Sequence, residues 1–426
     1  MRFFLVILYC FYFCAIRSQS ASDSLAITID ELEKGFLSKN FSLLMYQYEI
    51  EAVKALEIQA RVFDNPSIYI EQSIYNPQSK RYFPAKTVYG DGTLGQNQIN
   101  LSQVFSIAGK RNKRLKVAKI NTQLAQYQLY DLLRTLRYQL RTSFYNLYYN
   151  LKTYQVYSDQ ISAIEKNINA YKEQVDKGNI SLSEYLRLSA FLNLLKGERR
   201  ESTFAINEAN NNLHVLMGDT SLKFYKPLFF QKEIIIDEKV LDLKSMLDSS
   251  VTSRSDVKIQ EYLTRQERAN LEYQKALGVP DLSVAGTYDR NGSYIQNYYG
   301  IGLGLQVPIF NRNQGNIRAA KARIKEGELN QQFYKVVVQQ DVISAYKILI
   351  ETNNVYLSTD KTLQKKFNDL LKGLTDNYTK RNISIVEFID YYESFKNNII
   401  QLNKLENELY NATENLNYEV GKTIIK

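Results

Sequence analysis

The chain has few of the residues on which most enzymes and metal proteins depend. Its 426 residues include one histidine, two cysteines and no tryptophan. Cys10 and Cys14 both lie in the first apolar run, so a chain that has lost this run can form neither a disulfide nor a thiolate metal site. His214 stands near the end of an expected helix, where a structural role is commoner than a catalytic one. Because no nucleophile motif, phosphate loop or metal cluster is present either, we predict no catalytic, cofactor-binding or metal site.

Proline is also scarce, and two long stretches have none. The six prolines lie at positions 66, 77, 84, 227, 280 and 308. Since proline costs roughly 3 kcal/mol inside a helix, residues 110–177 and 316–380 are predicted to be uninterrupted helices. At about 1.5 Å per residue, the first would be roughly 100 Å long. Its apolar residues recur every three or four positions between wide polar faces, which is typical of a helix in a coiled-coil array.

No long apolar run follows the N-terminal segment, so we expect no transmembrane helix. The first 20 residues have the pattern of a secretory signal peptide: Arg2, an apolar run at 3–16, and small residues at Ser18 and Ser20. A single membrane anchor is the alternative. Bulky aromatic residues precede both cysteines where a lipoprotein signal needs small ones, so we do not expect a lipid anchor.

The chain is basic, but its charges are mixed. It has 54 basic and 45 acidic residues, for a formal net charge of +9. The main cluster of one sign is at residues 110–114 (KRNKR), which we interpret as a corner between a strand and a helix. A nucleic-acid groove is the alternative, but no reader motif or basic stripe accompanies the cluster, so we predict no nucleic-acid partner.

A short motif occurs twice. Residues 179–186 (NISLSEYL) and 382–389 (NISIVEFI) share four identical and three similar positions, and they are 203 positions apart (382 − 179). Helical stretches that end at a proline, 40–66 and 254–280, begin the two halves. The chain is therefore predicted to be an internal repeat. Each half would contain a helix, two strands joined by a loop, a very long helix, a tight turn and a further long helix.

Four segments alternate apolar and polar residues, and tyrosines are common in the loops between them. The segments are 67–75, 97–105, 282–289 and 301–307. Such alternation over about ten residues is typical of membrane β-barrel strands, and tyrosine suits a membrane interface. Soluble hairpins are the alternative. We favour the barrel because the chain also has a signal peptide and very long helices.

Four strands are too few to close a membrane barrel, whose smallest examples have about eight. Open sheet edges do not occur in lipid, so several copies of the chain must contribute strands to one barrel. The predicted fold class is therefore mainly α with a small β part. It is an internally duplicated coiled-coil barrel of long helices, with four membrane strands per chain.

These features together resemble the TolC-like outer-membrane efflux family over essentially all of the chain after the signal. The resemblance rests on the repeat, the two turn motifs and the two strand-to-helix corners, residues 101–111 (LSQVFSIAGKR) and 307–315 (VPIFNRNQG). The corners and the short C-terminal end favour the heavy-metal (cation) efflux branch. By this resemblance the chain has a signal peptide (1–20), two efflux repeats (21–218 and 251–426) and an equatorial segment (219–250).

The resemblance implies a homotrimer that closes a 12-stranded barrel among the lipids of the outer membrane. Its helices would form a tunnel that projects into the periplasm. The chain would be the exit duct of a tripartite efflux pump, passively conducting what an inner-membrane efflux transporter expels through a periplasmic adaptor protein. Whether the cargo is a metal cation or a drug would depend on the transporter. No cofactor is implied.

The resemblance also assigns an entrance and a gate. The family's pattern for acidic rings at the periplasmic entrance matches residues 385–390, which makes Glu387 and Asp390 ring positions. A tyrosine and an acid of the gate links match Tyr378 and Glu184. The gate arginine of the family has no counterpart, because Ile383 occupies its position, although residues 380 and 381 nearby are basic. The alternative role of the three carboxylates is to cap helix N-termini, where they are favoured by about 0.3–1 kcal/mol.

The tight turns are the expected docking surface for the adaptor, because they end the long helices. The residues assigned to this surface are Gly178, Asn179, Ser181, Asn382 and Ser384.

Other function classes explain less of the sequence. A secreted or surface coiled-coil structural or adhesion protein would account for the helices but not for the alternating strands or the matched turns. A passive porin would not need a helical tunnel of about 100 Å. A hydrolase with paired carboxylates would need a deep cleft, which long helices do not offer. We therefore predict a channel and not an enzyme.

Overall fold

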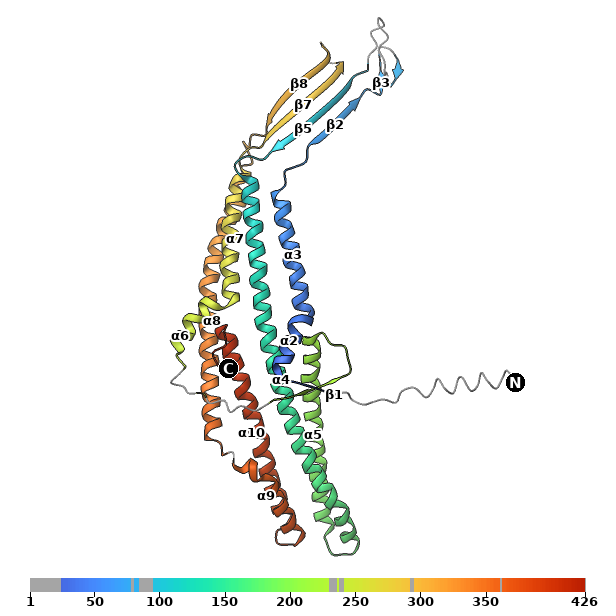
Figure 1. Ribbon diagram of the computed structural model, residues 1–426, viewed down its shortest axis with the longest axis vertical. Helices are drawn as coiled ribbons and strands as arrows, with labels where there is room; N and C mark the ends of the chain where they lie inside the picture. The colour runs from blue at the N-terminus through green and yellow to red at the C-terminus, as the bar shows by residue number, and fades with distance from the viewer. Residues whose placement is uncertain are drawn as a thin grey trace, which may run out of the picture. The chain divides into compact units, whose positions relative to one another are not determined.

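The computed structural model describes residues 24–77, 80–83, 95–229, 236, 241–291, 295–360 and 362–425. These residues are mainly helical, with a small amount of sheet (Figure 1). They divide into two compact units. The first comprises residues up to 44, 132–253 and 339–426, and the second comprises 45–131 and 254–338. Each unit draws on both halves of the repeat. The expected signal peptide lies outside the described residues.

The second unit contains a four-stranded antiparallel sheet. Its strands lie in the order β2 (Ser67–Gln72), β5 (Asn97–Phe105), β7 (Leu282–Asn291) and β8 (Gln296–Leu305). β5 pairs directly with β7, so the sheet joins the two halves of the repeat. The four alternating segments are thus confirmed as strands, although β2 and β8 end earlier than expected. A short hairpin, β3 (Tyr75–Asn76) and β4 (Arg81–Tyr82), lies beyond β2.

The register gives this sheet one apolar and one polar face. Residues directly opposite one another in paired strands share a face, and one such row runs Ile68, Leu101, Gly286, Ile301. Ile68 is 67% exposed and Ile301 is 88% exposed. The other face carries small polar side chains, among them a pair of serine hydroxyls 2.7 Å apart on β2 and β5. The predicted alternation is confirmed, and it leaves a broad apolar surface that the described residues do not cover.

The helices of the second unit pack alongside one another below the sheet. They are α3 (Phe41–Arg61), α7 (Ser255–Leu277), the first part of α4 (Lys110–Asp176) and the first part of α8 (Gln314–Ser358). The 67 residues of α4 confirm the uninterrupted helix expected over 110–177.

The second expected long helix is interrupted, so the prediction of one helix over 316–380 is wrong. α8 ends at Ser358, and α9 (Thr362–Thr379) begins after a short break. The hydroxyls of Ser358 and Thr359 both donate to the Val355 carbonyl, over 2.9 and 2.8 Å. Such bonds compete with the helical backbone, and two of them in succession accompany the end of the helix.

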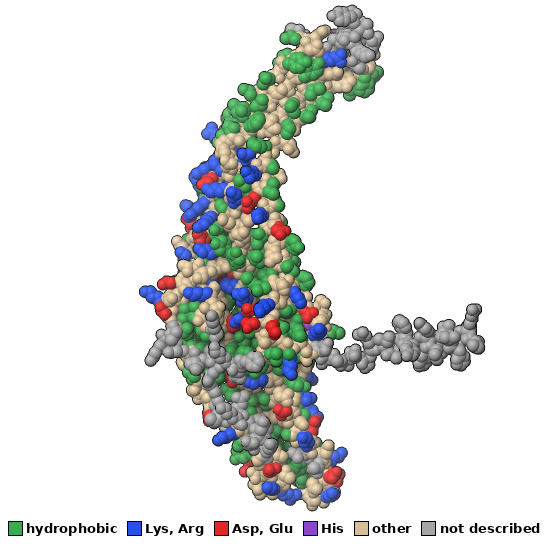
Figure 2. All heavy atoms as spheres, viewed as in Figure 1, with side chains coloured by type: hydrophobic (Ala, Val, Ile, Leu, Met, Phe, Trp, Pro, Cys, Tyr) green, Lys and Arg blue, Asp and Glu red, His purple; other side chains and the backbone are tan. Residues whose placement is uncertain are grey.

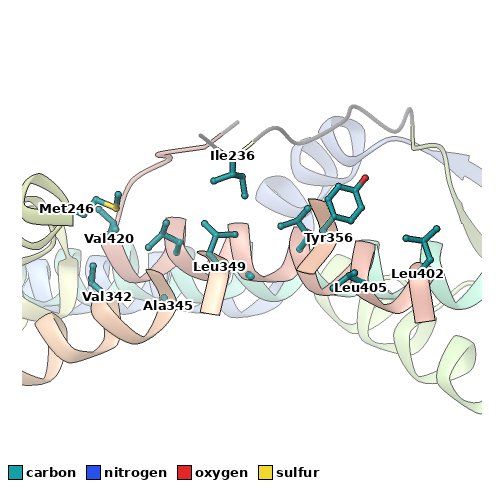
Figure 3. Close-up of a cluster of buried hydrophobic side chains, with 12 residues drawn as sticks. Ile236, Met246, Val342, Ala345, Leu349, Tyr356, Leu402, Leu405 and Val420 are labelled. Carbon is teal, nitrogen blue, oxygen red and sulfur yellow. The ribbon is translucent and has the colours of Figure 1, made fainter. Parts of the chain in front are cut away.

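The first unit is a helical bundle with a small parallel pair of strands. Its other helices are α2 (Ile29–Lys39), α5 (Leu182–Met217), α6 (Leu243–Ser253) and α10 (Ile385–Val420). β1 (Ser24–Ile27) pairs in parallel with β6 (Phe224–Pro227), a pairing the sequence did not predict. One core cluster is formed where apolar side chains of α6, α8 and α10 meet (Figure 3).

Candidate functional site at the two helical turns

The repeated motif forms two turns with the same backbone design, one between α4 and α5 and one between α9 and α10. In the first turn, the amides of Gly178 and Asn179 donate to carbonyls in the last turn of α4, over 2.9 Å each. In the second, the amides of Arg381 and Asn382 donate in the same way to the end of α9, over 3.0 and 2.9 Å. These bonds satisfy carbonyls that a helix end leaves open. The repeat is therefore preserved at the level of individual hydrogen bonds.

The two turns differ at the residue that reverses the chain. Gly178 has a φ of 74°, and Arg381, 203 positions later (381 − 178), has a φ of 60°. Glycine adopts this left-handed conformation freely, whereas a residue with a side chain loses about 1–2 kcal/mol there. The second turn therefore contains local strain that the first does not.

Both following helices begin with a serine cap. Ser181 accepts a hydrogen bond from the Glu184 amide over 3.3 Å, and Ser384 accepts one from the Glu387 amide over 3.2 Å. At the second turn the Glu387 carboxylate also accepts a bond from the Ser384 amide over 2.8 Å, which completes a capping box. Hydrogen bonds from the backbone amide of Ser384, and to a lesser degree from its side chain, lower the pKa of the Glu387 carboxyl. The helix-capping role considered as an alternative thus applies to Glu387.

The two turns contact one another through charged and aromatic groups. The Arg381 guanidinium donates a hydrogen bond to the backbone carbonyl of Asn179 in the other turn. Just behind this bond, the rings of Tyr171 and Tyr378 stack with centroids 5.2 Å apart, and Tyr378 stacks on Phe388 at 4.7 Å. Tyr378 is buried, and this burial raises the pKa of its hydroxyl. The stacked rings therefore form an apolar contact just behind the hydrogen bond between Arg381 and Asn179.

A cavity of about 480 Å³ lies between the turns. Five of the residues assigned from the sequence line it: Asn179, Ser181, Glu184, Tyr378 and Ser384. The structure therefore brings the predicted gate pair, Glu184 and Tyr378, into one cavity, although within the described residues no hydrogen bond joins them directly. The negative charge of Glu184 also contributes to the raised pKa of Tyr378.

The remaining assigned residues lie at the surface. Gly178 and Asn382 are exposed within their turns. Glu387 and Asp390 are exposed on α10, three positions apart on one helix face, and neither lines the cavity. Residues at this spacing are neighbours on a helix, so each chain presents a pair of carboxylates beside its second turn.

Sequence reasoning missed the roles of Tyr171 and Arg381. The position that matches the family's gate arginine holds Ile383, whereas the bond between the two turns is made by Arg381. The equivalent of Arg381 in the first half is Gly178. A glycine in a tight turn indicates a left-handed backbone position, so Gly178 could have drawn attention to Arg381. Tyr171 lies in α4 ahead of the repeated motif, so the motif gave no indication of it.

The single histidine has structural contacts. Nδ1 of His214 lies 3.2 Å from the Asp219 carbonyl, and Nε2 lies 2.8 Å from the Lys223 carbonyl, so the ring holds the loop that follows α5. In the part of the chain that the structure describes, no three His, Cys, Asp or Glu side chains come together in a way that could hold a metal ion. None of the helices described combines the length and apolarity needed to cross a bilayer.

A curated relative supports the family resemblance. No family model matches the chain. The chain is 23% identical over 297 residues to the cobalt-zinc-cadmium resistance protein CzcC of Cupriavidus metallidurans. The match covers 66% of this chain and 63% of that protein, so it spans somewhat less than two thirds of the relative's length.

Solved structures show the same fold. The outer-membrane channel OprN superposes with a TM-score of 0.71 at 13% identity, covering 92% of this chain and 89% of that chain. CusC, whose structures concern transmembrane channel formation, superposes with a TM-score of 0.71 at 15% identity, covering 96% of each chain. The expected resemblance to TolC-like outer-membrane channels is therefore confirmed, with CzcC as a homologue.

Proposed function

We propose that this protein is the outer-membrane exit channel of an efflux pump and that three copies form the channel. The observation that carries the proposal is the sheet of the second unit, which has one exposed apolar face and one polar face. In a membrane the apolar face would contact lipid and the polar face would line water. A soluble structural or adhesion protein would have no use for this arrangement, and the solved structures OprN and CusC, which share the fold, are described as channels.

Assembly from several copies follows from the sheet edges. Among the described strands, β2 and β8 each pair with one neighbour in this sheet, so each has an edge available. Unpaired backbone groups are strongly unfavourable in lipid, and a long apolar edge in water promotes association. Joining β2 of one copy to β8 of the next removes every edge once the ring closes. Three copies would give the 12 strands that the family resemblance implies.

The proposed pump also contains a periplasmic adaptor, docked on the two turns, and an inner-membrane transporter that supplies the cargo. The turns suit docking because Gly178, Asn179, Ser181, Asn382 and Ser384 are exposed. We propose a metal cation as the cargo. The support is the similarity to a protein named for cobalt, zinc and cadmium resistance, together with the exposed carboxylates beside the second turn.

In a trimer, Glu387 and Asp390 would place six carboxylates around the entrance. Two such charges about 4 Å apart repel by roughly 4 kcal/mol at an effective dielectric constant of about 20. Bound cations would relieve this repulsion, so the ring would concentrate cations and repel anions. The capping bond of Glu387 is compatible with this role, because it lowers the pKa of the carboxyl and so favours the charged form.

Conductance measurements test the proposal. The protein extracted from outer membranes should run as a trimer in unheated detergent gels, run as a monomer after heating, and conduct ions in planar bilayers. Replacing both Glu387 and Asp390 with Ala should lower cation selectivity and weaken block by trivalent cations. Glu408→Ala is the matched control, because this exposed residue lies on the same helix 18 positions further on (408 − 390).

A protein that is monomeric in native membranes and forms no channel would contradict the proposed function. A double variant with unchanged selectivity and unchanged block would contradict the entrance ring alone. The carboxylates would then serve only to stabilise the N-terminal end of α10.

A further inference from the structure

The four helices next to the sheet lie in the same order as its four strands. Thr122 of α4 donates a hydrogen bond to Glu57 of α3 over 2.6 Å, so these two helices are neighbours. One ion pair of 2.8 Å joins α4 to α7, and another of 2.7 Å joins α7 to α8. The helix order α3, α4, α7, α8 therefore matches the strand order β2, β5, β7, β8. α3 and α8 are the two edge helices of this unit, as β2 and β8 are its two edge strands (Figure 1).

α3 has apolar side chains on two sides. One set faces the rest of the unit and is buried or half-buried: Ile50, Val53 and Ala60. The other set recurs every three or four residues and is exposed: Met45, Tyr48, Ala52 and Leu56. We call this exposed set the α3 stripe, and its Tyr48 is 70% exposed. Figure 2 shows hydrophobic side chains at the surface along α3.

α8 repeats this pattern. Ala320 and Val338 are buried on one side of the helix, whereas Leu329, Phe333 and Val336 are exposed on another. The three exposed residues, which we call the α8 stripe, are spaced by four and three positions, as in a coiled-coil seam. Phe333 is 64% exposed. Because an apolar side of a helix normally packs against a neighbour, each edge helix has one side that the described residues leave without the cover it requires.

Contacts at one height connect the two edges. The Asn121 side chain of α4, one residue before the partner of Glu57, accepts a hydrogen bond from Gln266 of α7 over 2.7 Å. Two residues before Gln266, the Thr264 side chain lies so close to Gly327 of α8 that a Cβ there would be 2.7 Å from its hydroxyl oxygen. Glu57 and Gly327 are therefore at the same height to within about one helical turn of 5.4 Å.

The two stripes lie at matching heights. α3 leads into the sheet and α8 leads away from it, so residues before Glu57 stand level with residues after Gly327. Tyr48 lies nine residues from Glu57 (57 − 48), and Phe333 lies six from Gly327 (333 − 327). The difference is less than one helical turn. The aromatic residues of the two stripes are therefore level with one another.

The polar interruptions of the two stripes also match. Gln59 follows the α3 stripe on the side of the sheet, and Glu326 precedes Leu329 of the α8 stripe; both are exposed. They lie two residues (59 − 57) and one residue (327 − 326) nearer to the sheet than Glu57 and Gly327. A glutamine amide donates hydrogen bonds that a carboxylate accepts. The two edges are thus complementary in their polar positions as well as in their apolar ones.

We propose that the α3 stripe of one copy packs against the α8 stripe of the next copy and forms a helical seam between copies. The proposal rests on the proposed function, since it takes the joining of β2 to β8 between copies as given. That pairing brings the edge helices of two copies side by side, because β2 follows α3 directly and α8 follows β8. Tyr48 then meets Phe333, and Gln59 meets Glu326. The seam adds an interface made in water to the one made in lipid.

Cross-linking of introduced cysteines tests the seam in the full-length protein in its native membrane. Oxidation of the double variant Tyr48→Cys, Phe333→Cys should give covalent dimers and trimers on heated, non-reducing gels, and neither single variant should. A disulfide needs Cα atoms about 4.4–6.8 Å apart. Within one chain α4 and α7 separate the two positions, and helix spacings of about 8–10 Å place them too far apart to react.

The matched control is the double variant Gln47→Cys, Lys335→Cys. Both residues are exposed and lie at the height of Tyr48 and Phe333, but on sides of their helices outside the two stripes. This variant should stay monomeric on the same gels.

A substitution without a cross-link gives an independent measurement. Phe333→Gln should lower the temperature at which the detergent-extracted trimer separates into monomers, because it removes an aromatic ring from the seam. Ile58→Gln is the control, since Ile58 is 70% exposed on α3 but lies outside the α3 stripe. It should leave the dissociation temperature unchanged.

A preferred disulfide between the Tyr48 and Phe333 positions, together with a loss of trimer stability in Phe333→Gln alone, supports the seam. Equal disulfide yields from the two cysteine pairs would overturn it, as would equal shifts in Phe333→Gln and Ile58→Gln. Trimers that conduct ions but form no disulfide at the Tyr48 and Phe333 positions contradict this inference alone. A wild-type protein that forms neither trimer nor channel contradicts the proposed function instead.

Discussion

The ion pair between Lys396 of α10 and Glu198 of α5 allows a quantitative test of how charge is buried in the first unit. The Lys396 ammonium lies 2.9 and 2.7 Å from the two carboxylate oxygens of Glu198. The partners are unequally buried, because the side chain of Lys396 is 3% exposed and that of Glu198 is 28% exposed. Removing one partner should therefore differ greatly from removing the other.

Glu198→Gln leaves a positive charge in the bundle without a counter-charge, and breaking a buried pair in this way typically destabilises a protein by about 3–5 kcal/mol. Lys396→Met places a flexible apolar chain in an apolar site and leaves a carboxylate that water can reach. Its expected effect is within about 1 kcal/mol of the wild type. The double variant should resemble Lys396→Met, because it leaves no buried charge.

Thermal unfolding followed by far-ultraviolet circular dichroism measures this difference. For a unit of this size, 1 kcal/mol corresponds to a shift of about 2–4 °C. Glu198→Gln should therefore lower the Tm by about 6–20 °C and Lys396→Met by less than about 4 °C. If Lys396→Met lowers the Tm as much as Glu198→Gln, the attraction within the pair matters more than the burial of the lysine, and the reasoning is refuted.

Three further predictions concern the loop after α5 and the caps. The pKa of Asp219 is about 2, below its ordinary 3.8, and a hydrogen bond from the backbone amide of Ser221 is the main cause. The stability that the charged Asp219 contributes is present above pH 4 and should be lost as the pH falls toward 2. Acid titrations of Asp219→Asn should lack this loss. Gly218→Ala should lower the free energy of unfolding, measured by urea denaturation, by at least about 1 kcal/mol, since φ is 59° and the new Cβ would lie 2.8 Å from a carbonyl oxygen. Ser384→Ala should cost about 1 kcal/mol and Ser181→Ala less, seen as faster amide exchange in each first turn.

The parts of the fold that the sequence predicted well are those fixed by local chemistry. The absence of proline indicated α4 almost to the residue, because nothing else in that stretch interrupts a helix. The alternation of side chains identified β5 at its observed bounds, since a strand with one apolar and one polar face must alternate. Neither inference required knowledge of a distant contact.

The parts that were missed depend on distant partners or on weak local signals. β1 and β6 have four residues each, too few for a recognisable period, and they pair across about half of the chain. The break between α8 and α9 contains no proline or glycine. It coincides with Ser358 and Thr359, two residues whose helix propensity is only slightly unfavourable. At the candidate site, the repeat located both turns, but only the fold showed which side chains cross between them.

The difference between Gly178 and Arg381 explains why the two copies of the turn are not interchangeable. Both residues hold the same left-handed position, so the backbone alone would favour glycine in both turns. Arginine loses about 1–2 kcal/mol there, whereas a hydrogen bond from a charged group contributes about 1.5–3 kcal/mol. The bond from Arg381 to the Asn179 carbonyl can therefore offset the strain, but only while the two turns remain in contact. The strain of the second turn is thus compensated by the first, which couples the conformation of one turn to the position of the other.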